Sequence, residues 1–463
     1  MLFLKYRYLS IAYHFKTEGA PMNIIGIIAE YNPFHRGHAY QIETLKKICH
    51  ADYVIIAMSG NFVQRGAPAL MDKYSRTEMA LHCGADLVLE LPTLFATASA
   101  ETFARGGVSL LNSTGIVTHL GFGAETDNIN ILSELANLLC LQPEPYREAL
   151  HRELKTGNSF PAARAKALET YLLSHPSTLS ENADSFFNTS GNNLQEILAS
   201  PNNILALEYL KALNTTVSGL IPIPILRQGN GYHDTTITED FCSASAVRAF
   251  LKEKPYWKNT PNDSDNYLDP SCASADLLKT AMPLNSYKIL KEYPHPFLFE
   301  DDFSTLLHYE LLLGDVDRLA AWGDSSPTLA RRLLREREYF TNWSEFCQRM
   351  KTKNITHTRI NRLCLHILLD IKQSDYQTFP VPSYLRILGF RKTAGPLLSA
   401  LKSHSKLPIL TDPKKAQTLL STQGQKLWEI DLRAADLYRL GLTAKGDYSM
   451  KREYRRQIIV SPL

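Results

Sequence analysis

The sequence has little of what marks a secreted or membrane-embedded protein. Only seven of its 463 residues are cysteines. None forms a CxxC pair, and all lie in apolar segments typical of reduced, buried thiols and not of a disulfide framework or a zinc site. No apolar run reaches the ~20 residues that a membrane span requires. We therefore expect a cytoplasmic protein with no membrane contact and no metal site built from its own side chains.

The chain also lacks a strong overall charge, but its charge is unevenly distributed. The formal net charge is only +3. Residues 331–406 contain fifteen Lys and Arg but five Asp and Glu, a net +10, so the rest of the chain carries −7. Because this charge lies on segments with helical patterning, it favours a polyanionic partner such as a nucleic acid over a merely solvated surface.

Short apolar runs alternate with helix-compatible segments in the first part of the chain. We predict strands over residues 24–29, 53–58, 86–91 and 117–122, and helices over 74–83, 97–112 and 128–139. Strands that alternate with helices indicate βαβ units and a doubly wound, Rossmann-like parallel sheet. In such α/β sheets, ligands bind beyond the carboxyl ends of the strands.

The first predicted strand is followed by a polar turn that contains two histidines. Residues 30–38 read Glu-Tyr-Asn-Pro-Phe-His-Arg-Gly-His. The pattern places His35 and His38 at the first turn of a helix, where free backbone N–H groups and the helix dipole favour an anion. Adenylyl-transferring enzymes grip the α-phosphate of ATP with a His-x-Gly-His arrangement. A metal site would need further ligands at usable spacing, and the remaining alternative is a pair of ordinary surface histidines.

A second motif, Ser-Ala-Ser-Ala-Val-Arg, occupies residues 243–248. A hydroxyl of Ser243 or Ser245 can cap the helix that follows, and Arg248 projects from its first turn. In His-x-Gly-His nucleotidyltransferases, a Ser-x-Ser/Thr-x-x-Arg element closes over the β- and γ-phosphates. Alone it would be a plain helix cap, but the two motifs together predict nucleotide chemistry.

Longer motifs extend this pattern along the chain. They are residues 58–66 (Met-Ser-Gly-Asn-Phe-Val-Gln-Arg-Gly), 86–92, 122–125, 158–161, 200–205 and 231–234. From about Met22 to about Leu401, the sequence therefore resembles the bacterial tRNA(Met) cytidine acetate ligases. These are nucleotidyltransferase-like proteins of the His-x-Gly-His type that use ATP and acetate to make N4-acetylcytidine at the wobble position of elongator tRNA(Met).

The resemblance implies a set of site residues. Catalytic roles would fall to His35, His38 and Arg248. One departure is Leu226, where the family tends to have a basic residue before Arg227. The implied ATP contacts are Ile28, Ala29, Glu30, Tyr31, Asn32, Pro33, Phe34, His35, Arg36, Gly37, His38, Ala39, Tyr40, Gln41, Gly123, Asn202, Asn203, Arg227, Ser243, Ser245 and Arg248.

The expected chemistry has two steps. Acetate would attack the α-phosphorus of ATP, with the histidines donating to the α-phosphate and Arg227, Arg248 and Mg²⁺ holding the leaving pyrophosphate. The weakly nucleophilic N4 of cytosine would then attack the acetyl-adenylate, after the base has left its stack. Glu30 and Glu125 are candidates for the base of this second step, and the sequence does not decide between them.

The basic helical region fits tRNA binding. Over residues 358–372 an apolar stripe runs along one side, while Arg359, Arg362 and His366 share another face. Such residues would contact phosphates and position the RNA without reading its sequence. The expected phosphate contacts are Arg331, Arg332, Arg335, Arg359, Arg362, Arg386, Arg391 and Lys392. The oligomeric state stays open, with a homodimer among the possibilities.

These patterns divide the chain into four parts. We expect an extension over residues 1–21, consistent with a mis-assigned start codon before Met22, and an ATP-binding catalytic α/β domain over 22–253. A linker rich in Asn, Asp, Pro and Ser would follow over 254–274, and a mainly α-helical, basic domain over 275–463. Its predicted helices are 303–313, 328–339, 342–351, 358–372 and 392–403.

Two other functions remain open. A small-molecule adenylyltransferase or acyl-adenylate ligase of the pantothenate synthetase kind would share the histidines but has no use for the +10 segment. A non-catalytic RNA-binding protein with a vestigial nucleotide site would not need both intact motifs.

Overall fold

The computed structural model describes residues 22–175, 197–198, 200–216, 218–227, 243–253 and 278–462. The expected extension over 1–21, the expected linker over 254–274 and the motif at 231–234 lie outside these residues. Within the described part of the chain, no helix is both long and apolar enough to cross a membrane.

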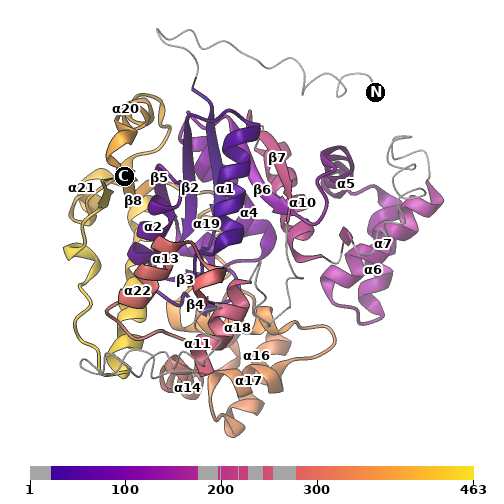
Figure 1. The fold of residues 1–463 in the computed structure, drawn as a ribbon. Helices are drawn as coiled ribbons and strands as arrows, with labels where there is room; N and C mark the ends of the chain where they lie inside the picture. Colours follow the sequence, from indigo (N-terminus) through magenta and orange to yellow (C-terminus); the bar gives the residue numbers. More distant parts are fainter. Residues whose placement is uncertain are drawn as a thin grey trace.

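A parallel sheet forms the centre of the molecule (Figure 1). Its parallel strands are β1 (Ile24–Ala29), β2 (Tyr53–Ser59), β5 (Leu87–Leu91), β6 (His119–Ala124) and β7 (Ile221–Leu226). They lie in the order β5-β2-β1-β6-β7. Strands β2 and β5, which follow β1 in the chain, lie on one side of it, and the later strands β6 and β7 lie on the other. The strand order therefore reverses between β1 and β6. The predicted doubly wound sheet is confirmed.

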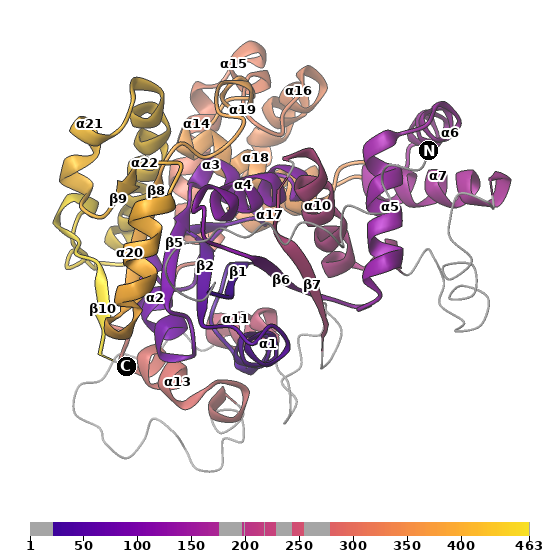
Figure 2. The ribbon, with the colours of Figure 1, turned by 90° about the horizontal axis from the view of Figure 1, so that it is seen from above.

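Alternate residues of the central strands face two separate apolar cores. Ile25 and Ile27 of β1 belong to one core, while Ile24 belongs to the other. The first core is covered by α1 (Arg36–Ile48), α2 (Lys73–His82), α11 (Ala244–Glu253) and α13 (Leu284–Glu292), and the second by α4 (Ala100–Ser113) and α10 (Pro201–Thr215). Figure 2 shows α1, α11 and α13 on one face of the sheet and α4 and α10 on the other.

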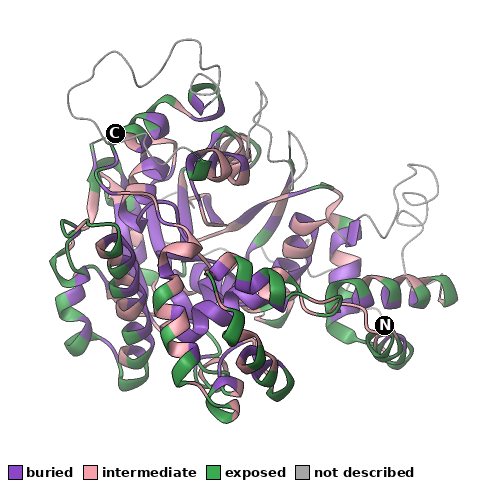
Figure 3. Ribbon diagram, turned by 90° about the horizontal axis from the view of Figure 1, so that it is seen from below, coloured by how far each residue is buried: buried purple, intermediate pink, exposed green. Residues whose placement is uncertain are grey.

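The helices that follow β5 and β6 differ in two details from what the sequence predicts. The helix expected over 97–112 is α4, which begins three residues later than predicted, because Ser99 is its N-cap and Ser99 Oγ accepts the N–H of Thr102. The short α3 (Thr93–Ala96) precedes it. Three further helices, α5 (Ile129–Leu141), α6 (Glu144–Lys155) and α7 (Phe160–Ser174), project to one side of the molecule (Figure 1). Figure 3 shows that their outer faces are largely exposed. Cys140 on α5 is exposed too, contrary to the expectation that the cysteines are buried.

The C-terminal part is mainly helical, as expected. The predicted helices correspond to α14 (Ser304–Leu313), α16 (Pro327–Glu336), α17 (Trp343–Met350), α18 (His357–Leu369) and α20 (Gly395–His404). The longest helix among the described residues, α22 (Thr422–Ala444), was not predicted. Shorter elements are α15 (Val316–Ala320), α19 (Asp375–Thr378), α21 (Ala416–Leu419), and the hairpin of β3 (Phe62–Val63) and β4 (Ala67–Pro68).

This part also contributes strands, which the sequence did not predict. Strand β8 (Leu385–Arg391) pairs antiparallel with β5, and β9 (Ile409–Leu410) and β10 (Ile459–Ser461) pair parallel with β8. The C-terminal segment therefore extends the sheet of the N-terminal segment. Strand β8 reads Leu-Arg-Ile-Leu-Gly-Phe-Arg. Its two arginines interrupt the apolar run, so the sequence did not indicate a buried strand.

A buried group of charges explains how β8 accommodates an arginine. Arg386 is fully buried, and its Nη2 lies 3.6 Å from Glu453 Oε1. Lys73 Nζ lies 2.9 Å from the same oxygen and 2.7 Å from Glu90 Oε1. The expectation that Arg386 contacts tRNA is therefore wrong, because its buried guanidinium lies against Glu453, the Tyr74 hydroxyl and the carbonyl oxygen of Leu410.

Candidate active site

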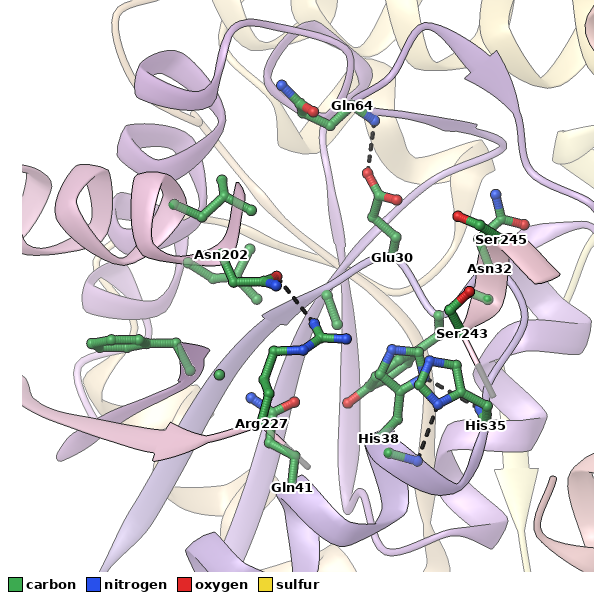
Figure 4. Close-up of a pocket in the computed structure, with 18 of the residues that line it drawn as sticks. Glu30, Asn32, His35, His38, Gln41, Gln64, Asn202, Arg227, Ser243 and Ser245 are labelled. Carbon is green, nitrogen blue, oxygen red and sulfur yellow. Dashed lines mark hydrogen bonds between the residues drawn. The ribbon is translucent and has the colours of Figure 1, made fainter. Parts of the chain in front are cut away.

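A cavity lies at the carboxyl ends of β1, β6 and β7, at the place where the strand order reverses. Figure 4 shows residues that line it. Most of the expected ATP contacts line it. They are Ile28, Ala29, Glu30, Tyr31, Asn32, His35, Gly37, His38, Tyr40, Gln41, Gly123, Asn202, Arg227, Ser243, Ser245 and Arg248.

The other expected contacts do not line this cavity. Phe34 is fully buried in the core beside α1, and Arg36 is exposed on the helix surface. Pro33 and Ala39 are not among the lining residues either, and Asn203 is buried against Glu125. Consecutive residues of a turn and a helix point in different directions, so a continuous run of contacts was not to be expected.

Several lining residues were missed. Gln64 and Arg65 come from the β3–β4 hairpin, and their position in the motif at 58–66 was a signal that could have found them. The other missed residues are mostly apolar. Phe122, Leu205 and Ala244 lie within motifs that the sequence showed, and Leu226 precedes Arg227, whereas no local pattern marks Phe103, Tyr209 or Ile225.

The side chains of the two histidines accept backbone hydrogen bonds within the first turn of α1. His35 is the N-cap, and its Nδ1 accepts the N–H of Gly37 at 3.0 Å, while His38 Nδ1 accepts the N–H of His35 at 3.3 Å. A neutral imidazole whose Nδ1 accepts carries its proton on Nε2. The rings stack with centroids 3.8 Å apart, and each has an Nε2–H left to offer. Two of the helix-opening N–H groups expected to bind an anion are thus taken, and the imidazoles supply donors in their place.

Electrostatics keep these rings neutral. Burial, with the nearby charges of Arg227 and Arg248, lowers the pKa of His35 to about 3. Burial first, and then His35 and Arg227, hold the pKa of His38 well below its usual value. At physiological pH, both rings therefore act as uncharged hydrogen-bond donors.

Arg248 joins the second motif to the first. Ser243 Oγ accepts the N–H of Ala246 at 3.1 Å, so the predicted cap of α11 is present. Arg248 Nη2 donates to Ser245 Oγ at 3.1 Å, and Nη1 donates to the carbonyl oxygen of Asn32 at 2.6 Å. The structure thus places the Ser-x-Ser-x-x-Arg element beside the turn that carries the histidines.

On the opposite side of the cavity, a chain of hydrogen bonds holds Arg227. Its Nη1 donates to Asn202 Oδ1 at 3.0 Å (Figure 4), and Asn202 Nδ2 donates to Glu125 Oε1 at 2.6 Å. Glu125 Oε2 accepts the N–H of Asn203 at 2.9 Å. Both carboxylate oxygens of Glu125 are therefore engaged, and they position the start of α10.

Four of the expected phosphate contacts gather in a second depression, which we call the basic hollow. Arg331, Arg332, Arg335 and Arg359 line it together with Ser326, Thr328, Leu329 and Ile355. It lies between α16 and the start of α18, far along the chain from the histidines. Lys392 is also exposed, but it lies outside the hollow.

Other expected phosphate contacts have structural roles. Arg362 Nε and Nη2 donate to the two oxygens of Asp324 at 2.7 and 3.0 Å. His366 is fully buried, with Nε2 2.9 Å from the carbonyl oxygen of Thr97. Arg391 Nε donates to the carbonyl oxygen of Leu81 at 2.8 Å. The helical pattern grouped Arg362 and His366 with Arg359, but it could not show that neighbouring segments cover that face.

Within the described residues, no group of three or more His, Cys, Asp and Glu side chains is placed to hold a metal ion.

The chain matches known proteins over nearly its whole length. The profile of the HIGH Nucleotidyl Transferase family matches residues 22–453. A tRNA(Met) cytidine acetate ligase of Thermoanaerobacter sp. (strain X514) is 37% identical over 419 residues, which cover 90% of this chain and 95% of that protein. The protein of the same name from Acetivibrio thermocellus is 35% identical over 445 residues, or 95% and 100% of the two chains.

Solved structures of a related protein superimpose on this chain. Apo Thermotoga maritima TmcAL (form I) superimposes with a TM-score of 0.83 at 30% identity, covering 96% of this chain and 100% of that one. The same protein bound with alpha-thio ATP superimposes with a TM-score of 0.80, at the same identity and coverage.

Proposed function

Since the chain belongs to the HIGH Nucleotidyl Transferase family, we propose that it is a tRNA(Met) cytidine acetate ligase. It uses ATP to join acetate to N4 of the wobble cytidine of elongator tRNA(Met), through an acetyl-adenylate. The observation that carries this proposal is the meeting of His35, His38, Arg227 and Arg248 around one cavity at the switch point of the sheet. It is supported by relatives of that name, which match along almost the whole chain.

The first step needs donors at the α-phosphate and cations at the leaving group. The Nε2–H groups of His35 and His38 are fixed by the bonds to their Nδ1 atoms. They would donate to the α-phosphate oxygens as the acetate oxygen bonds to phosphorus and the bond to the β-phosphate breaks. Arg227 and Arg248 would hold the departing pyrophosphate. Magnesium arriving with ATP would supply further charge neutralisation.

The rest of the nucleotide would lie toward α10. Phe122, Leu205 and Tyr209 form an apolar wall of the cavity next to Gly123. Such a wall suits the flat face of a purine. A side chain at position 123 would approach Arg227, because a Cβ built there lies 3.2 Å from Arg227 Cγ. A glycine at this position therefore lets the nucleotide and Arg227 share the space.

The basic hollow would receive the tRNA. Its four arginines can neutralise backbone phosphates, which supply sequence-independent affinity and orient the RNA. The cytidine would then leave its stack in the single-stranded anticodon loop to reach the acetyl-adenylate. From the tRNA substrate we also infer that the reaction takes place in the cytoplasm.

Incubation with ATP, magnesium, ¹⁴C-acetate and total tRNA tests the proposal. Nucleoside mass spectrometry should detect N4-acetylcytidine, and AMP and pyrophosphate should appear in equal amounts. Acetyl-coenzyme A should not replace acetate and ATP. A pantothenate synthetase-like ligase would form an adenylate but leave tRNA unlabelled. Formation of ADP and phosphate would contradict attack at the α-phosphate.

A further inference from the structure

Glu30 is a carboxylate in the cavity that the phosphate-binding groups do not use. It directly follows β1, is half-buried and lines the cavity. Its Oε1 accepts the N–H of Gln64 at 2.9 Å (Figure 4). Its Oε2 has no hydrogen-bond partner among the described residues. One oxygen is thus fixed, and the other is available to a ligand.

The chemistry of Glu30 does not suit a phosphate. An ionised carboxylate can only accept hydrogen bonds, and phosphate oxygens at neutral pH also only accept. Two such groups repel each other unless a cation lies between them. A ligand group that carries N–H donors fits better, and a carboxylate is the usual acceptor for the exocyclic N4 amino group of cytosine.

Both carboxylate oxygens of Glu125, the other candidate base, already accept hydrogen bonds within the protein. Its two oxygens accept from Asn202 and from the N–H of Asn203, at 2.6 and 2.9 Å, and its own N–H donates to Asn203 Oδ1 at 2.9 Å. It does not line the cavity. The structure therefore separates two carboxylates that the sequence left equivalent.

The surroundings of Glu30 are held rigidly. Arg76 is fully buried and donates to the carbonyl oxygens of Glu30 and Ser59, at 2.6 and 3.1 Å. Gln64 is fixed at both ends, because its Nε2 also donates to the carbonyl oxygen of Ala98 at 3.1 Å. A proton acceptor works best when its position is set before the substrate arrives.

The β3–β4 hairpin, which binds Glu30, also lies next to the helix that carries part of the basic hollow. Gly66, at the end of the hairpin turn that carries Gln64, has a φ of +76°. A Cβ built on it would lie 2.3 Å from the backbone nitrogen of Arg362 on α18. The hairpin therefore sits directly on α18, the helix whose first turn carries Arg359 of the basic hollow.

We propose that Glu30 is the general base of the acetyl-transfer step, an inference that rests on the proposed function. Its Oε2 accepts a proton from the N4 amino group of cytosine as N4 attacks the acetyl carbon. A C–N bond forms, the bond between the acetyl carbon and the phosphate oxygen of the adenylate breaks, and AMP leaves. Glu30 then releases its proton to water.

Separate assays of the two half-reactions test this role in Glu30→Gln. Glutamine keeps the size of the side chain and an acceptor for the N–H of Gln64, but it cannot take up the proton. Because Glu30 lines the nucleotide cavity, acetate-dependent exchange of labelled pyrophosphate into ATP should fall as well, but far less than acetyl transfer. Single-turnover acetyl transfer to tRNA should fall about 10²–10⁴-fold, the usual contribution of a general base. Glu30→Asp, which restores a carboxylate at a shorter reach, should recover part of the transfer rate.

The matched control is Glu43→Gln, an equally isosteric change on the exposed face of α1, where Glu43 pairs with Lys47. It should leave both half-reactions unchanged. A loss of pyrophosphate exchange in Glu30→Gln as large as the loss of acetyl transfer would overturn the proposal, because Glu30 would then hold the nucleotide or its magnesium. Normal acetyl transfer in Glu30→Gln would overturn it as well. Absence of acetate-dependent exchange in the wild type would instead refute the proposed function itself.

Discussion

At the scale of single residues, the two nitrogens of His35, and likewise those of His38, have different roles. Nδ1 of His35 and of His38 closes the first turn of α1, while Nε2 carries the proton that can reach a ligand. Folding and chemistry thus depend on opposite sides of the same ring. A substitution that keeps the acceptor and removes the donor should affect only the chemistry.

His35→Asn is such a substitution. Asparagine is a favourable N-cap whose Oδ1 can accept the N–H of Gly37, but it has no donor at the position of Nε2. Pyrophosphate exchange should fall about 10²–10³-fold, the cost of losing one donor to the developing charge, with little change in urea unfolding. His35→Ala should lose exchange equally and also about 1 kcal/mol of stability. Full exchange in His35→Asn would remove this residue from the mechanism.

The lowered pKa of His35 predicts how stability depends on pH. The folded protein takes up a proton on this ring only near pH 3, whereas the unfolded chain does so near 6.5. Below pH 6.5 the unfolded state therefore binds more protons, and stability should decline as pH falls from about 6.5 toward 3. Above pH 6.5 the contribution of this ring is fully present.

His35→Asn removes that titration, so its free energy of unfolding should decline less steeply than that of the wild type over the same range. Urea unfolding at a series of pH values measures the difference. Equal slopes would mean that His35 titrates normally in the folded protein.

At the scale of elements, α16 and α18 carry both the basic hollow and part of the helical core. Arg331 and Arg335 are exposed on α16, whereas Arg362 on α18 binds Asp324 with its guanidinium. Replacing Arg362 would leave the half-buried Asp324 poorly compensated and would mix a loss of stability with any loss of binding. The exposed arginines of α16 are therefore the ones that test RNA binding.

The double variant Arg331→Glu, Arg335→Glu should weaken tRNA binding at low salt. The slope of log affinity against log salt concentration should shrink by about 2, one for each lost phosphate contact. Pyrophosphate exchange should not change, because the hollow is separate from the nucleotide cavity. Filter binding over a salt series measures both quantities.

The control is Lys414→Glu, Lys415→Glu, which makes the same change in charge at exposed residues of the C-terminal part, away from the hollow. It should retain most of the affinity for tRNA. An equal loss in both double variants would show that overall charge, and not the basic hollow, governs binding.

At the scale of the whole molecule, one sheet unites segments that the sequence suggested were separate domains. Strand β8 covers the edge of β5, and Glu453 completes the buried charge group around Lys73 and Arg386. An isolated N-terminal segment would expose a strand edge and leave Lys73 with Glu90 alone. The exposed edge would leave backbone N–H and C=O groups of β5 unpaired. The loss of Glu453 would weaken the compensation of a buried charge, which destabilises the fold.

We therefore expect residues 22–253 expressed alone not to fold, and co-expression with residues 275–463 to restore a folded complex. Circular dichroism and limited proteolysis distinguish these states. The intact chain should unfold in urea in a single transition when followed in both segments. An independently folded 22–253 fragment would show that β8–β10 are accessory strands.

The sequence alone determined the α/β fold around β1 and indicated where a nucleotide site would lie. Apolar strands followed by helices predicted the doubly wound sheet, and the turn at residues 30–38 predicted where a nucleotide site would lie. These features are local, since a strand, a cap or a glycine turn depends on residues that are neighbours along the chain. That is why the strands around β1 and the N-cap at Ser243 agree with expectation.

Only the tertiary structure decided which charges are available. Arg386 and Arg331 read alike in the sequence, but Arg386 is buried beside Glu453 while Arg331 lines the basic hollow. Glu30 and Glu125 were equally plausible bases until the amide and backbone partners of Glu125 were placed. The cost of burying a charge is set by partners brought together by folding from distant parts of the chain. No pattern local to a helix or strand contains that information.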